Sequence, residues 1–439
     1  MGAVIALDEL VRLAKGELST DAYGPYTGPS LAALMEKKMP WRISVSETGE
    51  ARAALDFFGK AGLPLILDHA RYLGDAAEDI AQAGVPVIVD VPIITGNLPE
   101  LGKGEDARWP DVDVAARLRK AGVEVAITTP NNLSPRSLRF AAAVAMRGGM
   151  SEADALAAIT SVPAKILGVD DKVGSLASGR YADFIVMSGA PLDMTSNVVA
   201  TWTGGEPTWK ASDLIGRNED GGSAAKLASS AASKSAAPVV LRVEELHVGD
   251  GEIHRDVEVL LQDGKIAAIA PRVSRPLGAV VMSGKAAMPG MIDAMGHLGL
   301  EGSTRVPGPD FKLSQLVEPG DITDRRVAAH GVTTVVLAPR GPSNAGAPMM
   351  AYVPAGENVD HMVLADPAGM RFPWRESDRS KSGLRLRGVL RKAKDYKSKW
   401  DDYEEKLAKW TPPAPEPEPA PVAPDEDEGE DEDDEEEDE

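Results

Sequence analysis

The 439-residue sequence contains no cysteine and only six histidines. The absence of cysteine excludes disulfides, catalytic thiolates and Cys-ligated zinc sites, and the small number of histidines limits any imidazole chemistry. No run approaches the roughly 18 apolar residues of a membrane-spanning helix. The first residues, Met1 to Asp8, lack the basic start and the apolar core of a signal peptide. We therefore expect a soluble protein with no membrane partner, in a compartment that the sequence leaves open.

Basic residues are outnumbered, and the formal net charge is -21. Most of this excess lies in Asp425 to Glu439, which contains fourteen acidic residues and one glycine, so that the rest of the chain carries -7. We expect no nucleic-acid partner for such a chain. Residues 411–439 combine a Pro-, Ala- and Glu-rich spacer with this acidic run. Because neither part can bury a core, we predict a disordered tail.

Hydrophobic residues nevertheless make up 43% of the chain, which is enough for real cores. Up to about Trp209, short apolar runs alternate with helical patterns. The predicted strands are Trp41–Val45, Pro64–Asp68, Val85–Val89 and Glu124–Thr128, and the predicted helices are 49–60, 75–83, 135–147 and 151–167. This alternation predicts βαβ units and a parallel sheet, with any ligand at the carboxyl ends of the strands. Four such units make half of an eight-stranded α/β barrel.

A different pattern begins after a stretch rich in Gly, Ala, Ser and Lys, which predicts a flexible linker over residues 211–237. Strand patterns then follow at Val239–Leu246, Val257–Gln262 and Lys265–Ala270. Asp263-Gly264 separates the last two strands and is a strong hairpin signal, because both residues tolerate positive φ. We expect the strands of a β-sandwich over residues 238–287.

Four stretches resemble the amidohydrolase superfamily, in particular its imidazolonepropionase-like and dihydroorotase-like members. Ala155–Ala164 and Gly179–Val186 resemble the region in which such a chain leaves its barrel for a small β-sandwich. Met288–His297 resembles the first barrel strand, whose consensus is close to Pro-Gly-x-Ile-Asp-x-His-x-His, after an expected Pro-Gly turn. Val327–Val336 resembles a helix end and the second strand. The resemblance implies an α/β fold of partial TIM-like barrel segments with an attached β-sandwich.

The order of these stretches is reversed relative to a complete amidohydrolase. The resemblance implies the C-terminal half of one barrel over residues 1–210 and the N-terminal part of a second over 288–380. Either the chain is a piece of a longer tandem protein, or its halves pair as a permuted barrel that lacks two strands. We favour the tandem interpretation, because the last segment resembles an insertion that stops within a domain.

The resemblance also implies a site in which metal ions activate water and an Asp on the last strand shuttles protons. The strand-six histidine matches His69, and the second histidine of the first strand matches His297; these two are our candidate metal ligands. Met295 replaces the first histidine of that pair, Ser44 the strand-five histidine and Pro130 the shuttle Asp. Because catalytic zinc needs about three protein ligands, we expect no catalytic residues and no cofactor. Zinc or another divalent metal is expected only if the family site survives.

The other histidines have weaker signals. His330 precedes a glycine at a helix end, which predicts a helix cap. Three more are predicted at the surface: His247, His254 and His361. Three acidic residues could replace missing ligands, although nothing in their spacing singles them out: Glu47, Asp68 and Asp90.

Two functional hypotheses follow. By resemblance the chain is a metal-dependent hydrolase of carbon–nitrogen bonds other than peptide bonds, with its metal ligands and general acid/base lost; an active form would take a small amide-type substrate. The alternative is a non-catalytic structural or interaction unit of a longer tandem protein, with a second copy or a tandem unit as partner. An apolar stripe from Val389 to Trp410 predicts an amphipathic helix over 381–410, packed on its own domain or on a partner helix.

Overall fold

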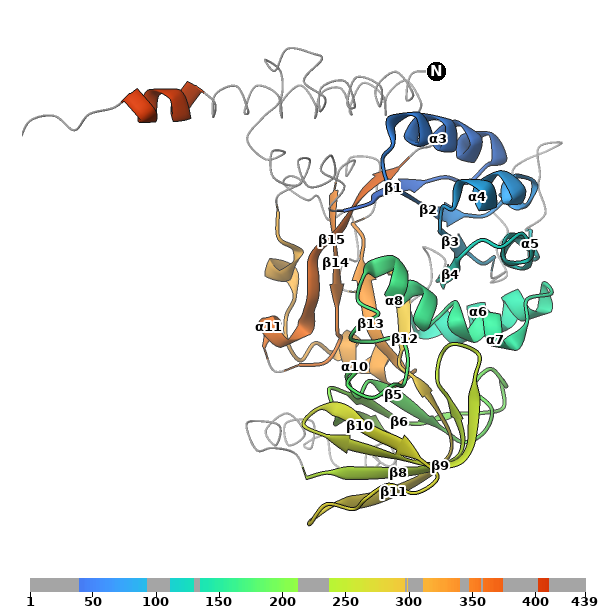
Figure 1. Ribbon diagram of the computed structural model, residues 1–439, viewed down its shortest axis with the longest axis vertical. Coiled ribbons are helices and arrows are strands. Elements are labelled where there is room, and N and C mark those ends of the chain that lie inside the picture. The colour runs from blue at the N-terminus through green and yellow to red at the C-terminus, as the bar shows by residue number, and fades with distance from the viewer. Residues whose placement is uncertain are drawn as a thin grey trace, which may run out of the picture. The chain divides into compact units, whose positions relative to one another are not determined.

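A computed structural model describes residues 39–92, 111–129, 135–211, 237–296, 298, 311–339, 347–356, 358–373 and 402–409. The chain divides into two compact units, Met1–Ser398 and Lys399–Glu439. The first unit contains one sheet of eight strands and one of seven (Figure 1). Within the described ranges, no helix is long and apolar enough to cross a membrane. The predicted linker, apart from its first and last residues, and the predicted acidic tail lie outside these ranges.

The larger sheet is a nearly closed barrel built from both halves of the chain. In spatial order its strands are β12 (Met291–Gly296), β13 (Val332–Leu337), β14 (Ala347–Tyr352), β15 (Val363–Pro373), β1 (Trp41–Ser44), β2 (Leu65–Ala70), β3 (Val87–Asp90) and β4 (Val125–Thr128). Strands β1 to β4 pair in parallel, as the predicted βαβ units require. The predicted α/β class and barrel-like sheet are confirmed.

The two halves of the chain meet in this sheet where β15 pairs in parallel with β1. Four residue pairs are in register, from Trp41 opposite Met370 to Ser44 opposite Pro373. The favoured interpretation, two incomplete barrels in tandem, is therefore wrong for these strands, and the permuted alternative describes them. The sequence could not distinguish the two because each half has the same local pattern whichever other half completes its sheet.

Strands β14 and β15 complete the barrel, although no pattern in the sequence predicted them. Strand β14 is antiparallel to both β13 and β15, so it runs against the other seven strands. An antiparallel strand can follow its neighbour without a crossover helix. The strand–helix alternation that marks the first half is therefore missing here, and the predicted gap of two strands does not exist.

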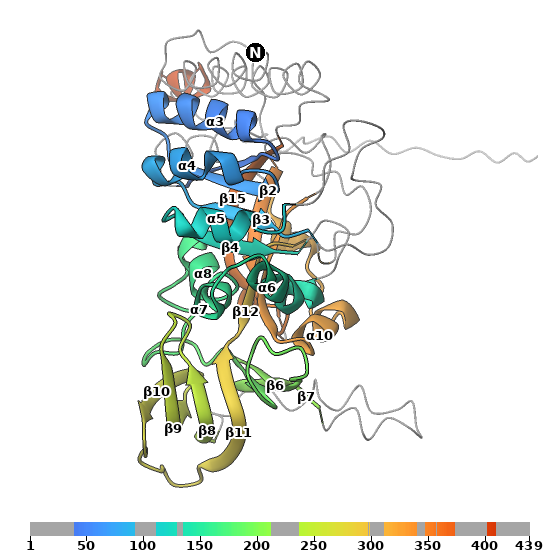
Figure 2. The same cartoon turned by 90° about the vertical axis from the view of Figure 1, so that its right-hand side faces the viewer.

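Helices lie along the outer face of β1 to β4 (Figure 2). The described residues of the first unit contain helices α3 (Thr48–Ala61), α4 (Ala77–Ala83), α5 (Val114–Lys120), α6 (Leu138–Arg147), α7 (Glu152–Ala157), α8 (Ser161–Leu167), α10 (Ile322–Ala328) and α11 (Val359–Met362). Short 3₁₀ turns occupy Gly74–Ala76, Pro135–Ser137 and Leu313–Leu316. Ala54 and Phe58 of α3 are buried in the same cluster as Trp41 of β1. This apolar layer holds the helices against the barrel.

The helix predicted from Ser151 to Leu167 is in fact two helices. Ser151 caps α7, because its Oγ accepts a hydrogen bond from the Asp154 N–H at 3.1 Å. Pro163 explains the break: proline has no N–H, and its ring clashes with the carbonyl four residues earlier in a continuous helix. Gly168 ends α8 in the left-handed conformation, with φ at +67°.

The link between α7 and α8 closes the second junction between the halves. The Ile127 N–H of β4 donates to the Ala158 carbonyl at 2.8 Å, and the Ile292 N–H of β12 donates to the Ile159 carbonyl at 2.8 Å. Two successive carbonyls therefore bridge β4 and β12, which have no hydrogen-bonded ladder between them. The break between α7 and α8 thus leaves these two carbonyls free to complete the barrel.

The smaller sheet also joins the two halves. Its strands, in spatial order, are β10 (Lys265–Ala270), β9 (Ile253–Gln262), β8 (Val239–His247), β11 (Val280–Pro289), β5 (Phe184–Met187), β6 (Val198–Thr203) and β7 (Glu206–Lys210). Asp263 and Gly264 have φ of 52° and 75°, which confirms the predicted hairpin. A bridge between Tyr181 and Lys265 brings edge strand β10 back towards β5. Where a β-sandwich was predicted, the described residues form this one curled sheet.

Gly290 connects the two sheets directly. Strand β11 ends at Pro289 and β12 begins at Met291, so the expected Pro-Gly turn is instead a passage between sheets. A Cβ at Gly290 would lie 2.0 Å from the Thr333 Oγ1, which leaves room only for glycine. The Gly290 N–H also donates to the Asp183 carbonyl at 3.0 Å.

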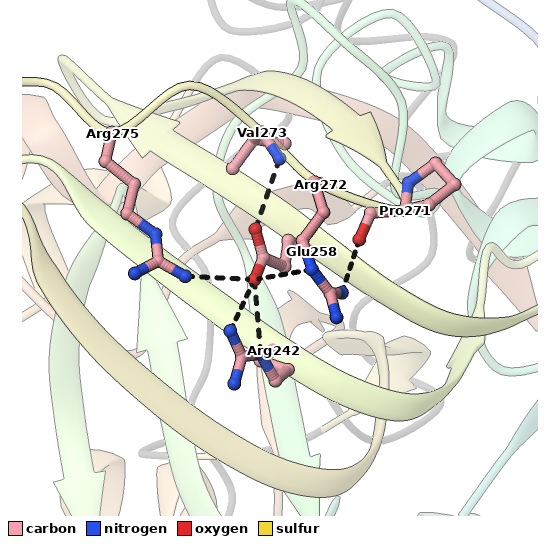
Figure 3. Close-up of polar contacts among 6 residues, drawn as sticks. All are labelled: Arg242, Glu258, Pro271, Arg272, Val273 and Arg275. Atoms are coloured by element: carbon pink, nitrogen blue, oxygen red, sulfur yellow. Dashed lines mark hydrogen bonds and ion pairs between the residues drawn. The ribbon is translucent and has the colours of Figure 1, made fainter.

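A buried carboxylate holds the connection between β10 and β11 onto the small sheet (Figure 3). Glu258 is fully buried, and its Oε1 accepts from Arg242 Nη2 at 2.8 Å and Arg275 Nη2 at 3.3 Å. Its Oε2 accepts from the Val273 N–H at 3.2 Å. The Arg242 and Val273 bonds lower the pKa of Glu258 to about 2. The cluster has a structural role, because its acceptor is saturated by donors from the sheet and the connection.

The buried Asp183 should give the small sheet a distinctive pH dependence. Burial raises the pKa of Asp183 from 3.8 to about 6, against the opposing hydrogen bond from the Gly204 N–H. The folded protein therefore binds a proton more readily than the unfolded chain, and this group's contribution makes the free energy of unfolding fall as pH rises from about 4 to about 6. We expect Asp183→Asn to remove about 2–3 kcal/mol of this fall, as measured by urea unfolding at several pH values. Asp193→Asn, at an exposed carboxylate, is the control, and identical profiles for wild type and Asp183→Asn would contradict the prediction.

The remaining histidine predictions have mixed outcomes. His330 caps the last turn of α10 as predicted, with its Nδ1 2.8 Å from the Arg326 carbonyl oxygen, and His361 is exposed as predicted. The surface prediction for His247 is wrong: it is buried, and burial lowers its pKa. Of the predicted helix over 381–410, residues 402–409 are described and are helical.

Candidate functional site in the barrel interior

The barrel interior is lined mainly by small and medium apolar side chains, as the two-residue period of a strand predicts. One buried cluster collects them from six strands: Ile66, Ile88, Ala126, Ala294, Met295, Val336, Ala338, Met349 and Ala351. Strands β1 and β15 differ, because each places an arginine among these apolar residues. Arg42 on β1 and Arg371 on β15 lie directly opposite one another in the parallel register.

Arg42 spans the barrel from one wall to the other. Its Nη2 donates to the Ala294 carbonyl at 2.9 Å, and β12, which carries Ala294, lies four places from β1 in the strand order of the sheet. Its Nε lies 3.7 Å from the Asp68 Oδ2. Both side chains are buried, with exposed fractions of 1% and 0%. The Arg42 hydrogen bond thus reaches across the barrel to the strand that resembles the metal-binding strand, while the Arg42–Asp68 ion pair joins the neighbouring strands β1 and β2.

The Arg42 guanidinium stays protonated although it is buried. Burial lowers the pKa of Arg42 to about 10, while Asp68 raises it and the neighbouring Arg371 lowers it further. A pKa near 10 leaves the guanidinium protonated at neutral pH. Arg371 donates from its Nε to the Ser44 Oγ at 3.2 Å and from its Nη1 to the Pro339 carbonyl at 3.1 Å. The hydroxyl that stands in the family's strand-five ligand position is therefore bound by an arginine.

Asp293 links β12 to β4 by side-chain hydrogen bonds. Its Oδ1 accepts from the Thr128 Oγ1 at 2.6 Å, and its Oδ2 accepts from the Thr129 Oγ1 at 2.9 Å. Thr128 Oγ1 also lies 3.0 Å from the Met295 carbonyl oxygen. Burial raises the pKa of Asp293, although these hydrogen bonds oppose the rise. The carboxyl group therefore closes the barrel at the junction that has no ladder.

Replacing Thr128 by valine tests this junction at nearly constant volume. The buried Asp293 would lose its shortest hydrogen bond, so we expect the free energy of unfolding to fall by about 1–3 kcal/mol in chemical denaturation. Thr334→Val is the matched control, because the Thr334 Oγ1 is buried without a hydrogen-bond partner among the described residues. That change should be neutral or slightly stabilising. Equal losses in the two variants would contradict a role for Asp293 in closing the barrel.

His69 lies at the end of β2, where the resemblance places a metal ligand. Its φ is +61°. Residues other than glycine rarely adopt this conformation, and it is found more often at functional or strained sites. Its Nδ1 lies 3.6 Å from the Asp90 Oδ2, an oxygen that also accepts from Arg71 Nη2 at 2.8 Å. His69 is buried, with 7% of its surface exposed. The structure therefore pairs His69 with a carboxylate on the neighbouring strand.

The described ligand positions do not fit the metal site that the resemblance implies. Met295 is buried in the apolar cluster, and its soft thioether is a poor ligand for hard or borderline cations. Ser44 is engaged by Arg371. In the part of the chain that is described, no three histidine or acidic side chains are grouped to hold a metal. His297 and Pro130 lie outside the described residues, so the candidate pair His69 and His297 stays a prediction.

Sequence reasoning missed Arg42 and Arg371, the residues that dominate this interior. A signal for Arg42 was present, since Trp41-Arg42-Ile43-Ser44 alternates apolar and polar residues and so predicts one polar face. Arg371 also lies between two apolar residues, Met370 and Phe372. Which face is inside, and that the two arginines are neighbours, follows only from the pairing of β1 with β15.

Comparisons with known proteins find similarity to amidohydrolases. Residues 29–210 match the family model described as "Amidohydrolase family". Imidazolonepropionases from Thermoplasma acidophilum and Cupriavidus taiwanensis are 32% and 31% identical to this chain over 138 and 129 residues. These matches support a relation of residues 29–210 to the amidohydrolase superfamily. A solved amidohydrolase from Thermotoga maritima is 27% identical, covers 47% of this chain and 54% of its own, and has a TM-score of 0.38.

The amidohydrolase match has a limited extent. The aligned regions cover 30% and 28% of this chain, and 31% and 30% of the two imidazolonepropionases. The chain therefore spans about a third of the length of the curated relatives that it matches. Met288–His297 falls outside residues 29–210, so its assignment to an amidohydrolase first strand rests on its motif and on the place of β12 in the barrel.

Proposed function

We propose that this chain is an amidohydrolase-superfamily barrel that does not hydrolyse carbon–nitrogen bonds and serves as a structural or interaction unit. The observation that carries the proposal is the Arg42 side chain, whose Nη2 reaches the Ala294 carbonyl at 2.9 Å inside the barrel. Ala294 lies within the motif that resembles the family's metal-binding strand. A buried guanidinium there would repel a metal cation bound at the same strand.

A second candidate function is the metal-dependent hydrolysis of carbon–nitrogen bonds other than peptide bonds. It is supported by the family match and by His69, which lies at a strand end with its Nδ1 3.6 Å from the Asp90 Oδ2. His69 and His297 would hold zinc or another divalent metal. The imidazolonepropionases that the chain resembles suggest a small cyclic amide as the substrate class.

Metal content and hydrolysis of the purified chain separate these functions. For the non-catalytic function we expect substoichiometric zinc, manganese and iron by mass spectrometry, and no metal-dependent opening of hydantoin, dihydropyrimidine or imidazolone rings. Stoichiometric metal that is lost in His69→Ala or His297→Ala, together with ring opening, would establish the hydrolase instead. Asn358→Ala, a helix cap far along the chain from both histidines, controls for non-specific loss of metal.

The partner of a non-catalytic unit is proposed to be a second copy or a tandem unit, and the C-terminal region is the segment to test. Tyr403 and Leu407 lie one helical turn apart in residues 402–409, and each is 53% exposed. Such an i, i+4 pair can contribute to a partner-binding stripe. Removing residues 389–439 should change the mass measured by light scattering. An unchanged mass would reject this region as the association surface.

A further inference from the structure

We infer that the guanidinium of Arg42 takes the place of a metal ion as the resident cation of the barrel, so that removing it creates a site for a hard divalent cation. The inference rests on the proposed non-catalytic function and gives a physical reason why the barrel would bind no metal. The family's metal would lie inside the barrel against the first strand, and Arg42 reaches that strand at the Ala294 carbonyl. The positive charge at this strand is thus a side chain, whereas the family resemblance implies a metal ion that can exchange with solvent.

The neighbours of Arg42 include oxygen atoms of the kinds that bind hard metal ions. Its neighbours are a carbonyl oxygen, from Ala294 at 2.9 Å, and a carboxylate oxygen, from Asp68 at 3.7 Å. Oxygen ligands of these two kinds are the ones that Mg²⁺, Ca²⁺ and Mn²⁺ prefer. Asp68 is fully buried, and within the described residues neither of its carboxylate oxygens accepts a hydrogen bond. Among the described residues, Arg42 places a cation beside Asp68, with the Arg42 Nε 3.7 Å from the Asp68 Oδ2.

The same contacts explain why the wild-type barrel should exclude a metal. A buried carboxylate needs a cation, because isolated charges are costly in an apolar interior. The Arg42 guanidinium is this cation, and it cannot leave the site because it is part of the chain. Arg371 lies beside it on the neighbouring strand. A divalent ion would have to enter against both guanidinium charges. Truncating Arg42 removes one charge, frees two kinds of oxygen ligand and leaves a space as long as the lost side chain.

The test compares wild type with Arg42→Ala by adding Mn²⁺ alone. We expect Mn²⁺ at saturation to raise the Tm of Arg42→Ala by about 5 °C and the Tm of wild type by much less. Ethylguanidinium, at a concentration too low to denature, should stabilise the variant in the same way, since it restores the missing cation. The double variant Arg42→Ala/Asp68→Asn should lose both responses. Arg52→Ala, at an exposed ion pair with Asp79, is the matched control and should show neither.

Two results would overturn the inference. One is a folded Arg42→Ala protein with no Mn²⁺ or ethylguanidinium response, and the other is a wild-type response as large as that of the variant. If Arg42→Ala does not fold, Arg42→Gln retains a donor for the Ala294 carbonyl and takes the same test. Failure of the proposed function is read separately, from metal-dependent ring opening by the wild-type chain, so the two failures cannot be confused.

Discussion

Arg42→Met should lower the free energy of unfolding by about 3–5 kcal/mol, the cost that follows when one partner of a buried ion pair is removed. Asp68 would remain fully buried without its cation, and the bond from the Arg42 Nη2 to the Ala294 carbonyl would be lost. Methionine keeps most of the side-chain length, so the loss reports charge and hydrogen bonding more than cavity formation. Denaturant unfolding, followed by tryptophan fluorescence, measures the effect.

The double variant Arg42→Met/Asp68→Asn shows whether this loss comes from the ion pair. Removing both charges should recover part of the stability, with a coupling energy of about 0.5–3 kcal/mol. The exposed pair of Arg52 and Asp79 has a distance of 2.6 Å between Nε and Oδ2 but exposed fractions of 56% and 47%. Arg52→Met should therefore cost less than about 1 kcal/mol. Similar losses at Arg42 and Arg52 would contradict the assignment of Arg42 as a buried cation.

Trp41→Ala should lower the free energy of unfolding by about 3–5 kcal/mol, because it leaves a large cavity where the two halves of the chain join. Trp41 is fully buried on β1 of the first half. Its ring centroid lies 4.9 Å from that of Phe372 on β15 of the second half and 5.6 Å from that of Phe58 on α3. The residue therefore packs across the junction as well as within its own half.

Hydrogen exchange distinguishes an effect on this junction from a general loss of stability. In Trp41→Ala, amides of β1 and β15 should exchange faster than those of the small sheet. Trp202→Ala is the matched control, since Trp202 is buried in the small sheet with its ring stacked 5.5 Å from Phe184. It should cost a similar free energy but increase exchange in β5 and β6. Uniform exchange in both variants would contradict the view that Trp41 specifically joins the halves.

The candidate site was predictable only in part. The motif around Asp293 correctly marked a buried strand at the barrel interior, whereas the loss of metal-ligand positions at Ser44 and Met295 stays a prediction. What occupies the interior could not be predicted, because Arg42 and Ala294 are 252 residues apart in the chain. Local patterns fix which residues share a face of a strand, but they carry no information on which distant strand lies opposite.

The sequence by itself determined the local elements of the first half, the Asp263-Gly264 hairpin, the cap at His330 and the resemblance to the amidohydrolase superfamily. These follow from residue periodicity and from side chains that bond to their own backbone neighbours. Only the tertiary structure decided that the two halves complete one barrel, through the β15–β1 ladder and the carbonyls of Ala158 and Ile159. It also decided that a guanidinium crosses the barrel interior, because that charge is stable only where Asp68 and a distant carbonyl converge on it.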